Sequence, residues 1–553
     1  MRLNKPTFYA LVLSLVLFNL ILRYPLDISH EMGSDTSFIH SLAASLVREG
    51  EALWVLHPLS YFGLYALSYP SAIPFLSAGT HLVADVPIEG TFLIIGFLFG
   101  VIGPLGMVLV GRSLTRDNRF ALFLALVMSL APFYIKDTMW IGASRGFVVA
   151  LVPFLLFLCI RVIQTRSTKA LFLLVTVVVM TSTIHRMGVL SLFVLIATIF
   201  VLPFHKVTQN LRFMLLRYDN GFRVTSLALS IAGFLGMFFL QFQFPGIAGA
   251  DVRAQYGSGT FFEGDSFGVL VLNMSVSFLG KVGILFPLAA AGLVMYIWKR
   301  PKEAPDKFLL LAVLIFLPLL SMRDYITEFV IPFLAVLIVF AIFRSMPSLR
   351  KRQRAVAAAT AIAIVIGAGA FAWIMKGYWA DRYATDAAIP DETYTASVYV
   401  RYHTQGTILT NYGLTGGRIT AISERPTLPL GGASLHWFSS QQLIFNYIDG
   451  RNVQVVARDL FTLNFNTDDL FAPVNVRNAQ TDWETVLYGH LADVSVSRLR
   501  DRYDSRYIFL DNEVTPARFI SYGLERDSPF IREVLVERYA IFSYYGGAIY
   551  FLG

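Results

Sequence analysis

Long apolar runs, separated by short polar connections, dominate the chain as far as Trp379. A helix of about 20 mostly apolar residues is long enough to cross the hydrocarbon core of a membrane. By this measure the pattern predicts about eleven membrane-spanning helices. Their approximate ranges are 7–23, 91–111, 120–135, 146–163, 170–184, 187–204, 225–243, 278–298, 308–321, 324–343 and 355–376. We therefore expect a polytopic α-helical membrane protein.

Lys and Arg residues are distributed unevenly over the connections between these spans. Arg2 and Lys5 precede the first span, so the positive-inside rule predicts a cytoplasmic N-terminus. The even-numbered connections are all strongly basic, whereas the odd-numbered ones are acidic or mixed. Their basic residues are Arg112, Arg116, Arg119, Arg161, Arg166, Lys169, Lys206, Arg212, Arg217, Arg223, Lys299, Arg300, Lys302, Lys307, Arg344, Arg350, Lys351, Arg352 and Arg354. This alternation predicts a plasma-membrane protein in which the residues after Lys376 lie outside the cytoplasm.

Three apolar stretches need a different interpretation. Residues 71–84 and 266–277 are too short to cross, and a crossing at 71–84 would invert every later loop. We interpret both as helices that lie on the outer leaflet or dip into it. If residues 170–204 formed one helix, His185 and Arg186 would lie in hydrocarbon, so a hairpin that turns at these two residues is favoured.

The composition changes after Trp379. Residues 380–553 are polar and contain strand-like runs, helix-like stretches and turn-rich loops. The strand-like runs are 406–410, 453–456 and 506–510, and residues 428–432 are typical of a turn. We expect a transmembrane domain over 1–379, with a long first outer loop (24–90), and an extracytoplasmic α/β domain over 380–553.

The overall composition supports the membrane assignment. Hydrophobic residues make up 56% of the chain and charged residues only 15%, whereas a soluble globular domain carries about 25% charged residues. The net charge of +8 follows from the basic connections and does not indicate nucleic-acid binding. Cys159 is the only cysteine, so no internal disulfide forms. ATP-driven transport and zinc-dependent hydrolysis find no support, because the chain lacks a P-loop, a His-Glu-x-x-His motif and a cysteine cluster.

The first outer loop carries the most informative polar residues. Apolar residues recur at helical spacing from Phe38 and predict an amphipathic helix over 36–48 at the membrane interface, with Asp35 at or just before its N-terminus. Asp35 has two interpretations: an N-cap for this helix, or a carboxylate that the same position also directs into a cleft. His40, about one turn later, is either an interfacial histidine or a substrate-binding residue. Glu31 is a weaker candidate because it lies in an irregular segment.

Further candidates lie elsewhere on the outer side. Asp137 is either ordinary loop charge or the partner of Asp35 across a cleft, as a second metal ligand or as half of an acid–base pair. Arginine suits a lipid phosphate because its planar guanidinium group binds two oxygen atoms at once. An arginine at the surface also fits simple snorkelling, and dense aromatics fit an interfacial belt as well as the wall of a substrate groove. The substrate-binding candidates of these kinds are Tyr69, Arg145, His185, Arg186 and Arg323.

Three segments carry a recognisable pattern. They are Gly33-Ser-Asp35 with the helix from Phe38 to Gly50, the series Gly63…Tyr69-Pro70…Pro74…Ala78, and Arg323-Asp-Tyr325…Pro332…Ala335. Together with the inside N-terminus, the long first outer loop and the outer C-terminal domain, they resemble the GT-C superfamily of membrane glycosyltransferases. This superfamily includes protein mannosyltransferases, aminoarabinose transferases and oligosaccharyltransferase catalytic subunits. The resemblance implies that Asp35 is the catalytic carboxylate and that Asp137 matches the second acidic position.

The chain also departs from individual members of this superfamily. The second outer loop has a single acidic residue in Asp137-Thr-Met139, where oligosaccharyltransferases have two. The Asp-Glu pair of protein mannosyltransferases is absent, since Asp35 is followed by Thr36, and residues 380–553 contain no Trp-Trp-Asp motif. None of those specific activities is therefore assigned.

We expect an enzyme that moves a sugar from a polyprenyl-phosphate donor to a glycan, lipid or protein acceptor at the outer face, with inversion and with Asp35 as general base. The expected cofactor is a divalent cation, Mg²⁺ or Mn²⁺, near Asp35 and Asp137. One alternative is a lipid or polysaccharide transporter or flippase, which would need more charge within the spans than Lys281 provides. Others are a glycan polymerase or ligase, which would use an oligosaccharide donor, and a scaffold protein.

Overall fold

The chain divides into two compact units by its internal contacts. The first comprises Met1–Tyr24, Ile95–Met139 and Ser144–Trp379, and the second comprises Pro25–Ile94, Trp140–Ala143 and Ala380–Gly553. The described parts of the first outer loop thus share a unit with the described residues after Trp379, whereas the sequence pattern assigns the loop to the transmembrane domain. The computed structural model describes residues 4–26, 28–50, 70–202, 266–299, 303–320, 324–345, 351–380, 388–410, 413–425, 427–429, 505–511, 540–544 and 547–551.

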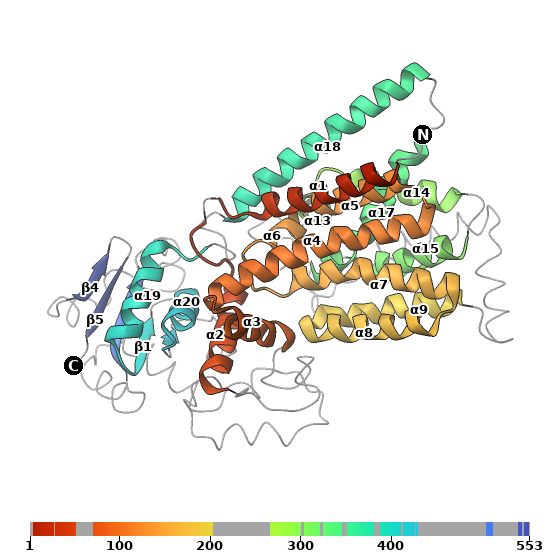
Figure 1. The fold of residues 1–553 in the computed structure, drawn as a ribbon. Coiled ribbons are helices and arrows are strands. Elements are labelled where there is room, and N and C mark those ends of the chain that lie inside the picture. Colours follow the sequence, from red (N-terminus) through yellow and green to blue (C-terminus); the bar gives the residue numbers. More distant parts are fainter. Residues whose placement is uncertain are drawn as a thin grey trace. The chain divides into compact units, whose positions relative to one another are not determined.

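The first unit is a bundle of apolar helices (Figure 1). Its helices are α1 (Lys5–Arg23), α4 (Ile88–Thr115, with its first turns in the second unit), α5 (Asn118–Ser129), α6 (Pro132–Lys136), α7 (Arg145–Thr165), α8 (Thr168–Ile184), η2 (Arg186–Leu190), α9 (Ser191–Val201), α13 (Phe267–Val282), α14 (Phe286–Trp298), α15 (Ala304–Phe316), η4 (Leu317–Leu319), α16 (Asp324–Phe329), α17 (Ile331–Ser345) and α18 (Lys351–Ala380).

Within the described residues, three helices are long and apolar enough to cross a membrane: α1, α4 and α7. A fourth is added if α13 and α14, which are bent by 94° at their junction, count as one span. Shorter apolar helices include α5, α8 and α17. These helices agree with a multi-pass membrane protein. The predicted count of eleven stays a prediction, because the span at 225–243 lies outside the described residues.

Several predicted spans are interrupted, among them the span at 324–343, which divides into α16 and α17. The span predicted at 120–135 divides into α5 and α6, because Pro132 has no N–H to continue the first helix and opens a second one. The span predicted at 278–298 is divided between the end of α13 and α14. Gly283 ends α13 with a φ of 97°, a backbone conformation that glycine adopts readily and other residues rarely do.

The hairpin predicted at His185 and Arg186 is confirmed. Helix α8 ends at Ile184, His185 has an extended backbone conformation (φ −156°, ψ 146°), and the chain turns through η2 into α9. The Nδ1 atom of His185 accepts a hydrogen bond from the N–H of Met187 (3.0 Å), which fixes the turn. His185 is therefore a structural residue of this turn whatever else it contacts.

Polar side chains fix α1 within the first unit. Arg23 is fully buried at the end of α1, where its Nε donates to Thr138 Oγ1 (2.7 Å) and its Nη1 donates to Asn19 Oδ1 (2.7 Å). Asn19 Nδ2 in turn donates to Ser129 Oγ (2.9 Å). Buried polar groups are costly unless they are hydrogen-bonded, so these pairings specify how α1 packs against α5 and the turn that follows α6.

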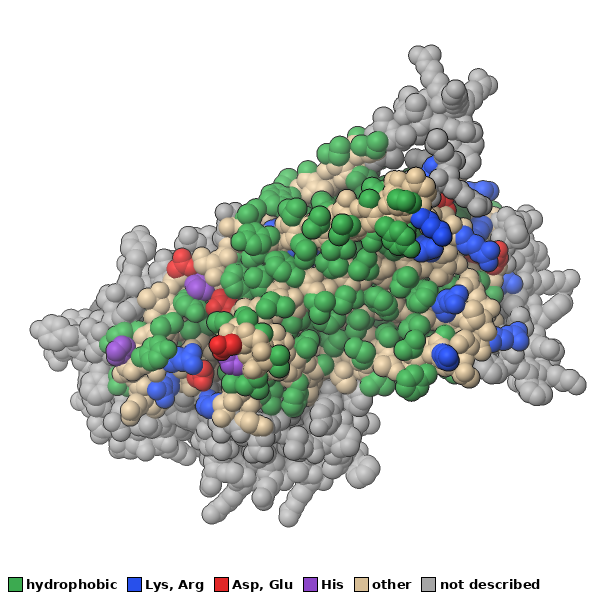
Figure 2. Space-filling view, in the orientation of Figure 1, with side chains coloured by type: hydrophobic (Ala, Val, Ile, Leu, Met, Phe, Trp, Pro, Cys, Tyr) green, Lys and Arg blue, Asp and Glu red, His purple; other side chains and the backbone are tan. Residues whose placement is uncertain are grey.

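Charge is segregated along the bundle. Figure 2 shows hydrophobic side chains over its length and Lys and Arg side chains gathered at one end. The connections α4–α5 and α7–α8 carry exposed basic residues, namely Arg112, Arg116, Arg119, Arg161, Arg166 and Lys169. Such segregation is expected of connections that share one side of a membrane.

The second unit combines helices with one sheet. Its helices are α2 (Ser34–Glu49), α3 (Ala72–Ala84), α19 (Asp391–His403) and α20 (Gly413–Ser423), and its strands are β1 (Thr407–Thr410), β2 (Thr427–Pro429), β3 (Ser505–Asp511), β4 (Ala540–Tyr544) and β5 (Gly547–Phe551). The strand order is β2-β1-β3-β5-β4. Strand β1 is parallel to β2 and β3, and β5 is antiparallel to β3 and β4. A small core of Ala396, Val400, Ile408, Ile419 and Phe509 joins α19 and α20 to this sheet.

The strands predicted at 406–410 and 506–510 are confirmed as β1 and β3. The run at 453–456 lies outside the described residues. The turn predicted at 428–432 is wrong at its start, because Thr427–Pro429 pairs with β1; Pro429 is tolerated since β2 is the outermost strand. The α/β domain as a whole stays a prediction.

Two helices predicted in the first outer loop are present. The stretch 71–84 forms α3, although its depth in the membrane stays a prediction. The helix predicted over 36–48 is α2, which begins at Ser34. Residues 36–46 are all buried where α2 packs on α3 and α20, so this part of the helix has no solvent-exposed polar face. Its position at the membrane interface stays a prediction.

Candidate functional site

Asp35 lies in the first turn of α2. Gly33 precedes this helix with φ 88° and ψ 141°, a conformation that residues with a side chain rarely adopt. Asp35 is the second helical residue and Gly33 holds the N-cap position, so the capping interpretation of Asp35 is wrong. The side chain is partly exposed. A carboxylate in the first turn interacts favourably with the positive end of the helix dipole, by about 0.3–1 kcal/mol.

The backbone on both sides of Asp35 is held by a distant part of the chain. Met32 forms an isolated parallel β-bridge with Ile141. Beyond Asp35, Thr36 Oγ1 accepts a hydrogen bond from the N–H of Gly142 (2.8 Å). Asp35 therefore sits on a segment that is fixed before and after it.

Glu31 and His40 form a buried ion pair whose members flank Asp35 in sequence. Glu31 Oε2 lies 2.8 Å from His40 Nδ1, and their side chains are 1% and 9% exposed. The backbone of Glu31 is anchored as well, since its N–H donates to Glu89 Oε1 (3.0 Å) and its carbonyl accepts from Ile389 (3.1 Å). The pair ties the segment that leads into α2 to the second turn of that helix.

The environment of His40 changes its proton affinity. Burial is the largest influence and by itself lowers the pKa of His40. The carboxylates of Glu31, Glu89 and Glu424 oppose burial and together raise the pKa of His40 above its ordinary value. His40 is thus charged over a wider pH range than a histidine in water.

This pair predicts a pH-dependent stability. The pKa of His40 is raised in the folded protein. Its contribution to the free energy of unfolding is therefore complete below the ordinary histidine pKa of about 6.5 and is lost as the pH rises through the raised pKa. We expect the wild type to melt at a higher temperature than His40→Gln near pH 6, and the gap to close at alkaline pH. Thermal melts of both proteins across this range measure it. A gap that is constant, or that widens with pH, would contradict the charged pair.

A second histidine meets Glu89, in the first turn of α4. His30 Nδ1 lies 3.0 Å from Glu89 Oε1, and the His30 ring stacks on Tyr394 with 3.7 Å between ring centroids. Tyr394 lies close enough to Glu89 for this carboxylate to act on its hydroxyl. Burial, followed by the charges of Glu89 and Glu31, raises the pKa of Tyr394 and keeps its hydroxyl protonated. One carboxylate thus connects α4, α19 and the segment before α2.

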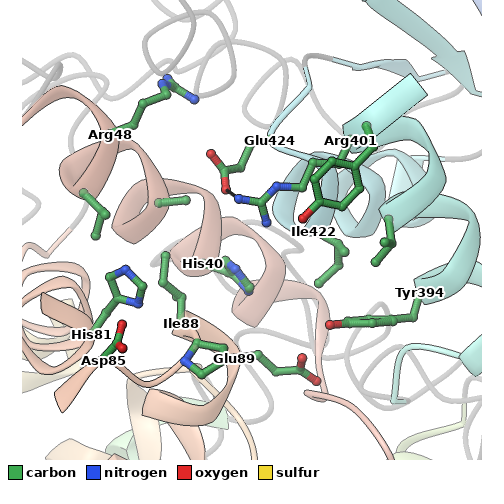
Figure 3. Close-up of a pocket in the computed structure, with 15 residues that line it drawn as sticks. His40, Arg48, His81, Asp85, Ile88, Glu89, Tyr394, Arg401, Ile422 and Glu424 are labelled. Atoms are coloured by element: carbon green, nitrogen blue, oxygen red, sulfur yellow. Dashed lines mark ion pairs between the residues drawn. The ribbon is translucent and has the colours of Figure 1, made fainter. Parts of the chain in front are cut away.

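A cavity of about 750 Å³ opens beside this network (Figure 3). His40 (7% exposed) and Ile88 form part of its depth, and Tyr402 (73% exposed) stands at its rim. Arg401 and Glu424 form an ion pair in its wall, with 2.5 Å between Arg401 Nη2 and Glu424 Oε1. All lining residues belong to the second unit.

In the first unit, Asp137 directly follows α6 and is fully buried. Its Oδ1 atom lies 3.4 Å from Lys136 Nζ. Gly146, in the first turn of α7, packs against it so closely that a Cβ atom there would lie 2.4 Å from the Asp137 carbonyl oxygen. The missing side chain of Gly146 is what allows α7 to approach Asp137.

Arg145 belongs to a charged group around Glu328. Arg145 Nη1 lies 3.7 Å and Lys281 Nζ lies 3.9 Å from Glu328 Oε1, and the Glu328 side chain is 2% exposed. Tyr325 contacts Arg145, with 5.8 Å between guanidinium carbon and ring centroid, and also His185, with 5.3 Å between ring centroids. The predicted residues Arg145 and His185 therefore meet at one tyrosine. Two cations and one carboxylate give this trio a net charge of +1.

The other sequence candidates have different outcomes. Tyr69 and Arg323 lie outside the described residues, and Arg186 opens η2. Asp35 belongs to the second unit and Asp137 to the first, so their pairing stays a prediction.

Sequence reasoning missed His30, Glu89 and Tyr394 and undervalued Glu31. The signal for Glu89 was its position, since a lone carboxylate in the first turn of a long apolar helix needs a partner. No comparable signal marks His30 or Tyr394, whose contact depends on the fold.

The predicted metal does not find a ligand set among the described residues. No group of three or more His, Cys, Asp and Glu side chains there is placed to hold an ion. Asp137 has the Lys136 ammonium group 3.4 Å away, whereas a hard cation prefers several oxygen ligands. Metal binding by Asp35 and Asp137 therefore stays a prediction, and no step below depends on it.

No protein-family model and no curated protein sequence matches the chain. Solved structures do match it. The oligosaccharyltransferase of Archaeoglobus fulgidus in complex with Zn and sulfate aligns over 98% of this chain and 72% of its own, with 13% identity and a TM-score of 0.59. ArnT from Cupriavidus metallidurans bound to undecaprenyl phosphate aligns over 99% and 97%, with 12% identity and a TM-score of 0.52.

The arabinofuranosyltransferase AftD from Mycobacteria aligns over all of this chain and 40% of its own, with 16% identity and a TM-score of 0.53. All three are GT-C glycosyltransferases. The resemblance seen in the sequence is therefore confirmed at the level of the fold, which this chain shares with them.

Proposed function

We propose that this protein is a membrane glycosyltransferase that moves a sugar from a polyprenyl-phosphate donor to an acceptor at the extracytoplasmic face, with Asp35 as general base. The fold it shares with three glycosyltransferases supports the enzyme class. One of them was solved with undecaprenyl phosphate, and another structure of the A. fulgidus enzyme holds a dolichol phosphate and an inhibitory peptide. Lipid phosphates are thus ligands of this fold.

The observation that carries the proposal is the position of Asp35. Its carboxylate is partly exposed in the first turn of α2, on a backbone that Ile141 and Gly142 hold in place. The Glu31–His40 pair ties the segment before Asp35 to the second turn of the same helix. A general base needs this combination of access to the substrate and a fixed direction.

The reaction is a single displacement. The Asp35 carboxylate takes the proton of an acceptor hydroxyl while that oxygen forms a bond to the anomeric carbon of the donor sugar. The bond between the anomeric carbon and the phosphate oxygen breaks, and the polyprenyl phosphate leaves with the electron pair. Attack opposite to the leaving group inverts the anomeric configuration.

The leaving phosphate gains negative charge, which needs an electrostatic partner. The sequence candidates for this role are Arg145, Arg186 and Arg323, because a guanidinium group binds two phosphate oxygens at once. Guanidinium and ammonium groups in a low-dielectric environment stabilise developing charge more strongly than they would in water.

The proposal is tested with the purified full-length protein in lipid nanodiscs. It is incubated with synthetic polyprenyl-phosphate donors that carry a single hexose, pentose or aminopentose, together with membrane extracts as acceptor. We expect release of polyprenyl phosphate and a glycosylated product of inverted anomeric configuration, detected by mass spectrometry and NMR. Translocation of intact donor without bond cleavage would replace the proposal by the transporter alternative. Consumption of an oligosaccharide donor alone would replace it by the polymerase or ligase alternative.

A further inference from the structure

The cavity beside His40 is not needed for the chemistry assigned to Asp35. Its lining uses one face of α2, formed by His40, Ala44, Val47 and Arg48. Asp35 is five residues before His40, which at 100° per residue places it about 140° around the helix. The cavity is therefore a separate site on the same helix as the proposed base.

The charges of the lining argue against a charged ligand. Glu89, Glu424 and Asp85 would repel a phosphate or another strong anion, while Arg48 and Arg401 would repel a cation. An acyl chain would cover these charges without offering them hydrogen bonds, which is costly. The lining fits a neutral ligand that can both donate and accept hydrogen bonds.

The shape and side chains add a second criterion. Tyr394 and Tyr402 present aromatic rings, and Ile88 and Ile422 add apolar surface, so the cavity combines flat apolar contacts with carboxylate acceptors and guanidinium donors (Figure 3). The lining elements are helices and a turn, without a strand edge that an extended peptide could join. A volume of about 750 Å³ lies within the range of small-molecule sites.

We propose that this cavity binds a neutral carbohydrate segment, with sugar hydroxyls on Glu89, Arg401 and Glu424 and a sugar ring against Tyr402. This assignment rests on the proposed function: the segment belongs to the acceptor glycan but does not include the sugar whose hydroxyl reacts at Asp35. Since His40 and Asp35 share α2, a glycan bound here is placed in a fixed register with the base.

Binding is tested without donor, on the full-length protein in nanodiscs, by saturation-transfer NMR. The probes are the neutral trisaccharides maltotriose, mannotriose, galactotriose and arabinotriose, the anionic trigalacturonate and a neutral hexapeptide. We expect at least one neutral trisaccharide to bind and Tyr402→Ala to weaken it about tenfold. Arg401→Gln should weaken it as well. Both residues are well exposed, so the fold tolerates these changes. His403→Ala is the control, because His403 is an exposed neighbour on α19 that does not line the cavity.

The outcomes separate the two proposals. Binding that Asp35→Asn retains and Tyr402→Ala weakens supports the cavity, even if the transferase assay gives no product. Absence of neutral trisaccharide binding, preference for trigalacturonate or the peptide, or equal effects of Tyr402→Ala and His403→Ala would overturn it. If the cavity binds the acceptor, Tyr402→Ala raises the KM for a trisaccharide acceptor in the transferase assay. The KM for a monosaccharide acceptor stays unchanged.

Discussion

Asp35→Asn is expected to lower turnover by a factor of about 10²–10⁴, the range typical of a lost general base. The amide has nearly the same shape and accepts hydrogen bonds through one oxygen, but it cannot take the proton of the acceptor hydroxyl. The anchors of the surrounding backbone, at Ile141 and Gly142, do not involve this side chain. Donor binding and thermal stability should therefore change little. The measurements are the initial rate of polyprenyl-phosphate release and the melting temperature of each protein.

A matched control makes this test specific. Asp117 is an exposed aspartate at the N-cap of α5, where its Oδ1 accepts from the N–H of Arg119 (2.9 Å). Asparagine is an equally good N-cap, so Asp117→Asn should leave both rate and stability near wild type. If Asp35→Asn turned over as fast as Asp117→Asn, Asp35 would have no role as the base.

The long apolar elements were readable from the sequence because their signal is local. Helices α1, α4 and α7 follow from runs of apolar residues, and the hairpin at His185 follows from the cost of placing charge in hydrocarbon. Strands β1 and β3 are also short local patterns. Breaks within apolar runs were missed, as at Pro132 and Gly283, because hydropathy does not register a missing N–H or a positive φ.

Helix α2 shows why burial was harder to predict than helix formation. The serines at 37, 41 and 45 are polar residues at helical spacing, yet all three are buried. The hydroxyls of Ser41 and Ser45 donate to carbonyls of their own helix (2.9 and 2.8 Å), so this part of the polar face can be packed without losing hydrogen bonds. Periodicity cannot distinguish such a face from a solvated one.

The candidate site depends on contacts of long sequence separation, which a single sequence does not reveal. Glu31 meets His40 only because an irregular segment folds back on α2, and it meets Glu89 across 58 residues. The sequence supplied Asp35, His40, Arg145 and His185 as residue types in suitable places. Which of them share an environment came from the fold.

Gly146→Ala is expected to destabilise the first unit strongly. A Cβ at this position would lie 2.4 Å from the carbonyl oxygen and 2.6 Å from the Cβ of Asp137, distances that real Cβ atoms essentially never show. The obstacle includes backbone, so it cannot rotate away, and either the end of α6 or the start of α7 must shift. Overpacking of this kind costs about 1–3 kcal/mol, and more where backbone has to move.

The same substitution at Gly79 provides the opposite expectation. Gly79 lies inside α3, and a Cβ there meets nothing within 4 Å. Alanine is a better helix former than glycine by about 0.5–1 kcal/mol, so Gly79→Ala should raise the melting temperature while Gly146→Ala lowers it. Both melting temperatures are measured in detergent, with size-exclusion chromatography and fluorescence detection to monitor the folded fraction after heating. Because Asp137 and Arg145 adjoin Gly146, transferase activity should fall with stability in Gly146→Ala and stay intact in Gly79→Ala. Equal melting temperatures for the two variants would contradict the close approach of α7 to Asp137.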